Sequence, residues 1–351
     1  MRKLILLSSL LISTTLAFSQ EGKVIQEKAT LFQLQHNADT IEFIVVDTVL
    51  SEKKPIFLWC QGSLPQPLFG EIYDPNNEWV YYFQGGGIAN FDYSEITMSY
   101  HLVVISMPHT PTAVSRENLS KQFLYVPDLS KPRKLSEKYI EADYLENYVV
   151  RGNKVLEFLA TKDWVKTDEL VVAGASQGSK VATKIATSNP MVTHLGLFSP
   201  NPFGRIDQFV RQPRLDAQLG KITWEKADSL MQQQYDFFKK VNNPDSLKSQ
   251  PRLKAWKTFS EPFYDDWLTL DIPIYLAYGT EDRTSDLCDI VPLFFISADK
   301  DNLTLKRYLH LEHNFFEVEE DGRTNYEKAH WNDVMMEFLN WLNKAANRVD
   351  G

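Results

Sequence analysis

Three residue types that together can cleave an ester or amide bond occur along the chain in the order serine, aspartate, histidine. The serine is Ser176, in residues 174–178 (GASQG), which match the pattern G-x-S-x-G. A strand-like run, 169–173, precedes it and a segment with helical spacing follows. Glycines around a serine between a strand and a helix permit a sharp turn that exposes the serine hydroxyl. We therefore predict that Ser176 is a nucleophile.

A serine nucleophile needs a base, and the base needs an acid that orients it. Asp282 follows the apolar run 273–278, and His313 follows the run 303–309. The carboxyl ends of parallel strands share one edge of a sheet, so we expect both side chains beside Ser176. The alternatives are two acids and three histidines: Glu281, Asp286, His194, His310 and His330.

Two backbone N–H groups are expected to stabilise the negative charge that develops on the substrate oxygen. Gln177 begins the helix after the nucleophile, so its N–H points out of the helix N-terminus. The second donor should come from the turn after the third strand, at residues 61–65, where Gly62 permits a close backbone approach. The Ser63 N–H is the predicted donor, and the Leu64 N–H is the alternative.

Two basic side chains are candidates for binding a substrate carboxylate or phosphate. His109 follows the run that ends near residue 106, and Arg205 follows the run that ends at residue 199. A loop-bracing role is the alternative for both. His310 and His313 do not form the H-E-x-x-H pattern of a zinc site, so we expect no metal, and the chemistry needs no cofactor.

The segments between these residues predict the framework that positions them. Eight runs have the apolar or alternating character of β-strands. They are residues 30–35, 41–47, 55–60, 102–106, 169–173, 195–199, 273–278 and 303–309. Helical periodicity occurs at residues 139–159, 177–188 and 326–346. This alternation predicts an α/β fold with a mainly parallel, eight-stranded sheet and helices on both faces.

Residues 201–270 interrupt the alternation. They contain helical segments around residues 224–241 and 246–259 and several aromatic side chains. A long insertion in a compact domain is often a lid or a binding element. We predict a helical lid between two late strands that covers Ser176, with aromatic residues suited to an apolar acyl or aryl group.

The first 19 residues have the pattern of a secretory signal. Arg2 and Lys3 precede the mostly apolar run 4–16, and the small residues Ala17 and Ser19 come before the expected cleavage site. We therefore expect one domain over residues 20–351, located in the periplasm or secreted. No run reaches the length of about 20 apolar residues that a membrane span needs, so no stable membrane insertion is expected.

Composition bears on partners and on cysteine chemistry. The formal net charge is -9 at pH 7 and no long basic run offsets it, which argues against a nucleic-acid partner. Cys60 lies in an apolar run and Cys288 in a later helical segment. Two separate buried thiols are favoured over a disulfide.

Four short segments together resemble the α/β-hydrolase superfamily, and more narrowly its dienelactone-hydrolase-like and prolyl-oligopeptidase-like members. They are residues 61–63, 174–178, 279–282 and 312–314, which read QGS, GASQG, GTED and EHN. The resemblance implies the α/β-hydrolase fold with a helical lid and a Ser176–His313–Asp282 triad. Gln61 departs from the histidine that many members carry there. The few residues before the first expected strand cannot form a propeller, which puts peptidase activity in doubt.

We therefore expect a carboxylesterase-like serine hydrolase. Its partner would be a small-molecule ester, either a simple acyl ester or an acylated sugar, cleaved through an acyl-enzyme. One alternative is an exopeptidase or amidase with the same triad. The other is a non-catalytic binding protein on the same fold.

Overall fold

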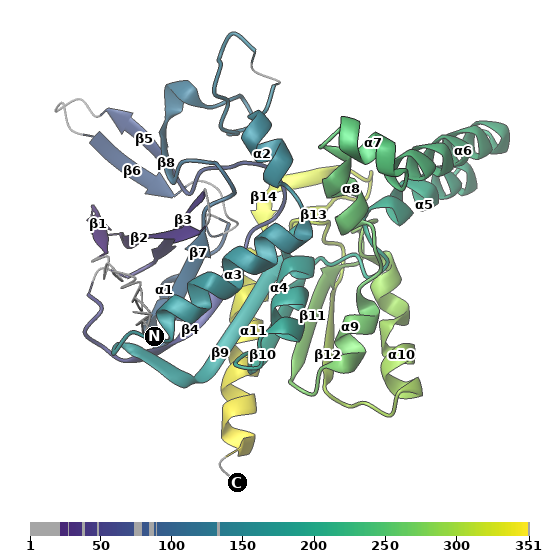
Figure 1. Ribbon diagram of the computed structural model, residues 1–351. Coiled ribbons are helices and arrows are strands. Elements are labelled where there is room, and N and C mark those ends of the chain that lie inside the picture. The colour runs from purple at the N-terminus through teal and green to yellow at the C-terminus, as the bar shows by residue number, and fades with distance from the viewer. Residues whose placement is uncertain are drawn as a thin grey trace, which may run out of the picture.

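The computed structural model describes residues 22–349 apart from 27, 37–38, 48, 74–78, 84–87, 89 and 132–133. The predicted secretory signal, residues 1–19, lies outside the described residues. The described part of the chain forms a central β-sheet with helices packed against both of its faces (Figure 1).

The central sheet has nine strands among the described residues, in the order β1-β2-β3-β7-β4-β9-β10-β11-β12. They are β1 (Lys23–Ile25), β2 (Ala29–His36), β3 (Asp39–Val45), β4 (Lys54–Cys60), β7 (His101–Ile105), β9 (Val165–Ala175), β10 (His194–Phe198), β11 (Ile274–Gly279) and β12 (Leu303–Tyr308). From β7 to β12 neighbours are parallel, whereas the β1-β2, β2-β3 and β3-β7 pairs are antiparallel.

The predicted α/β class and mainly parallel sheet are thus confirmed, but the predicted number of eight strands is wrong. The additional strand is β1, which pairs with the edge of β2 through three residues. Three residues are too few to show the alternation by which a strand is recognised in a sequence.

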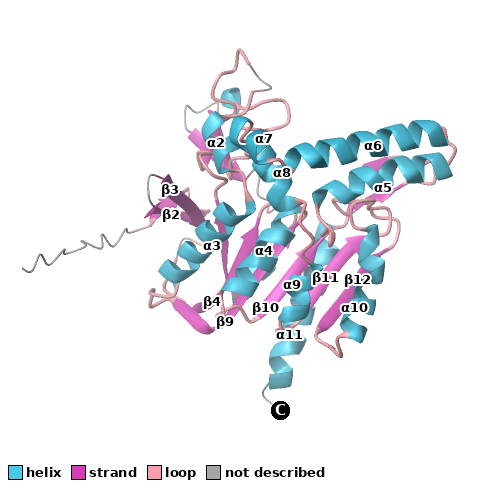
Figure 2. Ribbon diagram, turned by 45° about the vertical axis from the view of Figure 1, so that its right-hand side comes forward, coloured by secondary structure: helices cyan, strands magenta, loops and turns pink. Residues whose placement is uncertain are grey.

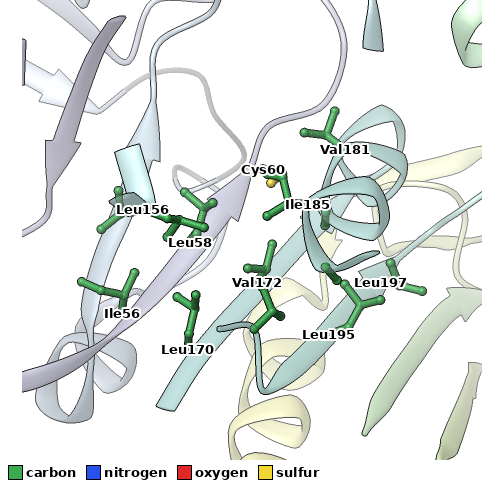
Figure 3. Packing of buried hydrophobic residues seen from close by; sticks show 14 of the residues in the cluster. Ile56, Leu58, Cys60, Leu156, Leu170, Val172, Val181, Ile185, Leu195 and Leu197 are labelled. Carbon is green, nitrogen blue, oxygen red and sulfur yellow. The ribbon is translucent and has the colours of Figure 1, made fainter. Parts of the chain in front are cut away.

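The helices that cover the sheet lie in two layers. On one face are α3 (Leu145–Leu159), α4 (Gln177–Ser188), α9 (Tyr264–Thr269) and α10 (Val291–Ser297), and on the other are α1 (Ser94–Ser99) and α11 (Trp331–Val349). Alternate side chains of β4 point to opposite faces of the sheet, so they pack into two separate hydrophobic cores, one on each face. Ile56 and Leu58 pack with side chains of α3 and α4 (Figure 3). Phe57 and Trp59 pack on the side of α11.

Between β10 and β11 the chain forms a series of helices before it returns to the sheet. They are α5 (Arg205–Gln218), α6 (Trp224–Val241), α7 (Pro244–Ser249), α8 (Leu253–Phe259) and α9. Helices α5 and α6 run side by side and project away from the sheet (Figures 1 and 2).

The sequence-based boundaries in this insertion are correct only in part. The segment predicted at 224–241 coincides with α6. The segment predicted at 246–259 is split into α7 and α8 at Pro251, because a proline disfavours helical backbone at the residue before it. Helix α5 was not predicted, and it carries Pro213 in its interior, which is unusual for a helix.

Two other predicted helices also have different limits. The segment 139–159 consists of α2 (Glu137–Ala142) and α3, separated at Asp143 and Tyr144. The last helix begins at Trp331 rather than at residue 326, because the preceding residues pair as a strand. The smaller sheets are formed by β5 (Phe69–Tyr73), β6 (Trp79–Phe83) and β8 (Ala113–Ser115), and by β13 (Phe316–Val318) and β14 (Thr324–Ala329).

The two cysteines are both buried and both free, which confirms the expectation of separate thiols. Burial raises the pKa of the Cys60 thiol to about 12, so it stays protonated at neutral pH. Within the described part of the chain, no helix combines the length and the apolar character needed to cross a membrane.

The contact between the start of α4 and the end of β4 generates a stability prediction. A Cβ atom on Gly178 would overlap the carbonyl oxygen of Cys60 and lie 2.5 Å from that of Gln61. Because backbone atoms cannot move aside cheaply, we expect Gly178→Ala to lower the free energy of unfolding by about 1–3 kcal/mol or more. Denaturant-induced unfolding measures this change.

Gly62→Ala is the matched control. The nearest atom to a Cβ at this position is the Ala175 carbonyl oxygen at 3.9 Å, an ordinary van der Waals distance. Its effect on unfolding should be much smaller. Equal stabilities of Gly178→Ala and the unsubstituted protein would show that this contact does not constrain the turn.

Candidate active site

Ser176 occupies the turn between β9 and α4 in a strained conformation, with φ 53° and ψ -120°. A non-glycine residue in such a region costs about 1–3 kcal/mol and persists only where its surroundings hold it. The Ser176 N–H donates to the Phe198 carbonyl of β10 at 2.9 Å. A Cβ on Gly174 would overlap the Gly178 carbonyl. Packing therefore accounts for both glycines of the motif and for the exposed position of the serine hydroxyl.

The structure brings Ser176, His313 and Asp282 into one hydrogen-bonded chain. His313 Nε2 lies 2.9 Å from Ser176 Oγ, and His313 Nδ1 lies 2.8 Å from Asp282 Oδ2. Asp282 also accepts from the Ser285 hydroxyl at 2.7 Å and from the Thr284 N–H at 2.9 Å. These bonds hold the carboxylate, and the carboxylate orients the imidazole toward the serine.

Electrostatics favour an ionised aspartate next to a basic imidazole. Burial opposes the charge on Asp282, but hydrogen bonds from His313, Ser285 and Thr284, with the charge of His313, hold its pKa below 3.8. Burial likewise lowers the pKa of His313, but the hydrogen bond and charge of Asp282 outweigh it, so this pKa lies above 6.5. The imidazole is therefore a stronger base than an isolated histidine.

The two predicted backbone donors lie at the same end of the sheet. Gln177 is the first residue of α4, where backbone N–H groups have no partner within the helix. Ser63 lines the pocket beside Ser176. The Gln61 side chain donates to the Ile105 carbonyl and so braces the loop that carries Ser63. Leu64, the alternative donor, has a φ of 84°.

A cavity of about 440 Å³ opens beside Ser176 and His313. Its apolar wall comes mainly from the insertion and is formed by Phe209, Trp256, Phe259 and Phe263, together with Leu135. Polar side chains line the remainder, among them Asp143, Lys180, Asn201, Arg205, Gln208 and Thr284. The insertion therefore forms much of the wall around the nucleophile.

The rival acids and histidines lie elsewhere. Asp286 pairs with Arg211. His194 is at the start of β10, and its Nδ1 lies 3.0 Å from the Thr193 hydroxyl. Glu281, His310 and His330 line a separate hollow next to β13.

The two candidate substrate-binding residues differ in where they lie relative to the cavity. Arg205 begins α5 and lines the cavity. His109 is not among the described residues that line it, which corrects the expectation that it faces the pocket. Its Nδ1 lies 3.3 Å from Asp39 Oδ1, and Asp39 also pairs with Arg151 at 2.5 Å. This acidic partner on β3 gives His109 the bracing role.

Sequence reasoning missed several polar residues of the cavity, among them Tyr139, Asp143 and Lys180. Lys180 lies one turn after Ser176 on α4, so helical spacing alone could have suggested it. Asp143 and Tyr139 reach the cavity because the chain breaks between α2 and α3. No motif marks that break.

Among the described residues, no group of three or more His, Cys, Asp or Glu side chains is arranged to hold a metal ion. The hydrogen-bonded chain of Ser176, His313 and Asp282 is suited to nucleophilic attack by the serine with proton transfer through the imidazole, with the ionised aspartate stabilising the imidazolium.

No protein-family model matches the sequence, and a comparison with curated proteins finds no match. Solved structures resemble the fold. A protein of Acinetobacter baumannii described as a lipase has a TM-score of 0.51 and 13% identity, over 92% of this chain and 93% of that chain. A protein of Bacteroides ovatus described as a dipeptidyl aminopeptidase IV has a TM-score of 0.50 and 11% identity, over 89% of this chain and 35% of that chain.

Acylaminoacyl peptidase of Pyrococcus horikoshii matches over 89% of this chain and 41% of its own, with a TM-score of 0.49 and 13% identity. The chain thus spans well under half the length of the two peptidases it matches. The likeness to the Acinetobacter and Bacteroides proteins, with the strand order of the sheet, shows the fold. The protein has the α/β-hydrolase fold.

The opposite pKa shifts of Asp282 and His313 can be tested without any substrate. We expect NMR titration to give His313 a pKa above 6.5. Asp282→Asn removes the charge that raises this pKa and leaves burial, which lowers it, so the pKa of His313 should fall. Asp286→Asn is the control, because Asp286 pairs with Arg211 rather than with His313. A His313 pKa that Asp282→Asn leaves unchanged would contradict the assigned pairing.

Proposed function

We propose that the protein is a serine hydrolase that cleaves an ester bond through an acyl-enzyme on Ser176. One observation carries the proposal: the His313 imidazole is hydrogen-bonded on one side to the Ser176 hydroxyl and on the other to the buried Asp282 carboxylate. This arrangement lets one ring remove a proton from the nucleophile and later return it.

In the first half of the reaction, Ser176 Oγ attacks the ester carbonyl carbon while His313 Nε2 takes the hydroxyl proton. The bond to the alcohol oxygen then breaks, and His313 donates that proton to the departing alcohol. In the second half, His313 takes a proton from water, whose oxygen attacks the acyl-enzyme. The proton returns to Ser176 Oγ as the acid product leaves. Asp282 stays ionised and stabilises the imidazolium in both halves.

The carbonyl oxygen becomes negatively charged in each half of the reaction. The N–H groups of Gln177 and Ser63 are the proposed donors to it. The Gln177 N–H has the further advantage of the positive end of the α4 dipole. Removing one such donor in hydrolases costs about 10²–10³-fold in turnover.

The cavity supports an ester as the substrate class. Aromatic side chains of the insertion, such as Trp256 and Phe259, suit an apolar acyl or aryl group. The amide side chains of Asn201 and Gln208 also line the cavity and could bond the hydroxyl groups of an acylated sugar. A small-molecule acyl ester or acylated sugar is therefore the proposed substrate.

An exopeptidase with the same triad is the second candidate. Both an acidic side chain, Asp143, and a basic one, Arg205, line the cavity. A side chain whose charge is opposite to that of a peptide terminus could hold that terminus, which favours this candidate. The ester is preferred because the Asp143 carboxylate already accepts from the Tyr148 hydroxyl at 2.8 Å. The ratio of kcat/KM for matched ester and aminoacyl-amide substrates distinguishes the two.

The reactivity of Ser176 is the direct test of this function. A fluorophosphonate probe should label Ser176, and mass spectrometry should find the adduct on the peptide that contains Gln177. Ser176→Ala and His313→Ala should each lower kcat for ester hydrolysis by about 10³-fold or more. His330→Ala is the control, because His330 pairs with Asp333 outside the cavity and most activity should remain. Labelling that persists in Ser176→Ala would refute the nucleophile.

We also propose that the protein is exported, to the periplasm or beyond, with residues 1–19 as the signal. The support is the charged start, the apolar run and the small residues before position 20. N-terminal sequencing of the protein expressed in a bacterial host should give a mature chain that starts at Gln20. A soluble cytoplasmic form that retains Met1 would contradict export.

A further inference from the structure

Arg205 holds a positive charge against the cavity wall. Its guanidinium carbon lies 5.4 Å from the centre of the Trp256 ring and 5.1 Å from that of Phe259. One N–H donates to the side-chain oxygen of Gln177, the residue after the nucleophile. Among the described residues, no ion pair within 4.0 Å joins Arg205 to a carboxylate. A guanidinium has five N–H donors, so groups remain for a ligand.

Lys180 adds a second cation on the neighbouring helix α4. Its side chain is 3% exposed, lines the cavity, and donates to the Glu261 carbonyl. Its Nζ also lies 5.0 Å from the centre of the Phe263 ring. An ammonium group has three donors, so this carbonyl does not use all of them.

The cavity contains little negative charge to balance these two cations. Asp143 is the one acid among the described residues that line it. Burial raises the pKa of Asp143 and so disfavours its charge, while the hydrogen bond from Tyr148, the charge of Arg205, and hydrogen bonds from Tyr139 and Gln177 act against that shift without overcoming it. Its carboxyl group is therefore already engaged.

Two cations next to a nucleophile are costly to bury unless an anion completes the site. We propose that Arg205 and Lys180 bind a free carboxylate of the substrate, so that the ester cleaved at Ser176 is an acidic one. This inference rests on the proposed function. Arg205 would form two parallel bonds to the carboxylate, and Lys180 would contribute a third.

The charge of Lys180 gives this site a pH signature. Burial, with smaller contributions from Lys184 and Arg205, lowers its pKa to about 7 against the opposing charges of Glu261 and Asp266. Lys180 is therefore protonated below about pH 7 and loses its charge above it. The preference for an acidic ester over a neutral one should decline as the pH rises through this value. Titration of His313 affects both substrates alike and cancels from the ratio.

Two pairs of substrates test the proposal and locate the carboxylate. Mono-4-nitrophenyl adipate and 4-nitrophenyl hexanoate differ by a carboxylate on the acyl side. 4-Carboxyphenyl and 4-carbamoylphenyl hexanoate differ by one on the alcohol side. We expect the acidic member of one pair to have a kcat/KM about 10–100-fold higher than that of the neutral member, because hydrogen bonds to a charged group contribute that much. A preference in either pair supports the proposal and assigns the side.

Substitutions then assign the preference to residues. Arg205→Gln should bring the ratio close to one, and Lys180→Met should reduce it and remove its decline near pH 7. The matched controls are Arg214→Gln on α5, whose side chain lies over Trp224, and Lys184→Gln on α4, which pairs with Asp266. Both controls should keep the ratio below pH 7. Arg214→Gln should also keep its decline near pH 7, whereas Lys184→Gln should move that decline to higher pH, because Lys184 lowers the pKa of Lys180.

A measurement on the unsubstituted protein keeps the test independent of variant folding. Adipate should slow fluorophosphonate labelling of Ser176 at concentrations where hexanamide does not. Cleavage of neutral esters without preference for either acidic member, and no protection by adipate, would overturn the inference but leave the proposed function intact. An acid preference that Arg205→Gln and Lys180→Met both retain would also overturn it. Absence of both ester cleavage and labelling would overturn the function and the inference together.

Discussion

The strained turn at Ser176 depends on how closely the start of α4 approaches the ends of β4 and β9. The register that pairs Cys60 with Gly174 places the loop after β4 directly beside this turn. A residue larger than glycine at position 178 would overlap the backbone of that loop. The same contact therefore exposes the serine hydroxyl and places Ser63 and Gln177 along the same cavity. Further along the same edge of the sheet, Gly279 of β11 pairs with Tyr308 of β12. The loops that follow these two strands bring Asp282 and His313 together.

Two carboxyl groups near Ser176 show how environment sets charge. Asp282 and Asp143 both experience burial, which disfavours the ionised form. Asp282 faces an imidazole that can carry a positive charge, and its pKa is lowered. Asp143 accepts a hydrogen bond from the Tyr148 hydroxyl and lies near the charge of Arg205, but burial outweighs both and its pKa is raised. The hydrogen bonds from His313, Ser285 and Thr284, with the charge of His313, outweigh burial only at Asp282, so this is the acid kept ionised for an imidazolium.

The site divides between two parts of the chain. The sheet edge supplies Ser176, Asp282 and His313, whose positions follow from strand pairing. The insertion supplies Arg205, Trp256 and Phe259, which form the wall of the cavity. Helix α9 ties this insertion to α4, because the Trp267 indole N–H donates to the Thr183 hydroxyl at 2.8 Å and Lys184 pairs with Asp266 at 2.7 Å. Ser176, Asp282 and His313 therefore follow the ends of sheet strands, whereas the apolar wall of the cavity is built mainly on helices of the insertion.

Much of the fold was determined by the sequence itself, because a strand buried on both faces must be a continuous apolar run and a sharp turn must contain small residues. Those signals are local, and they sufficed for the eight main strands, α4 and the order serine, aspartate, histidine. The edge strand β1, the proline-containing helix α5 and the break at Asp143 were decided by tertiary contacts. His109 and Arg205 look equivalent in the sequence, since each follows a strand. The structure separates them because Asp39, distant in sequence, pairs with His109, while the rings of Trp256 and Phe259 hold Arg205 at the cavity. Which way a long polar side chain points depends on partners that only the folded chain brings near.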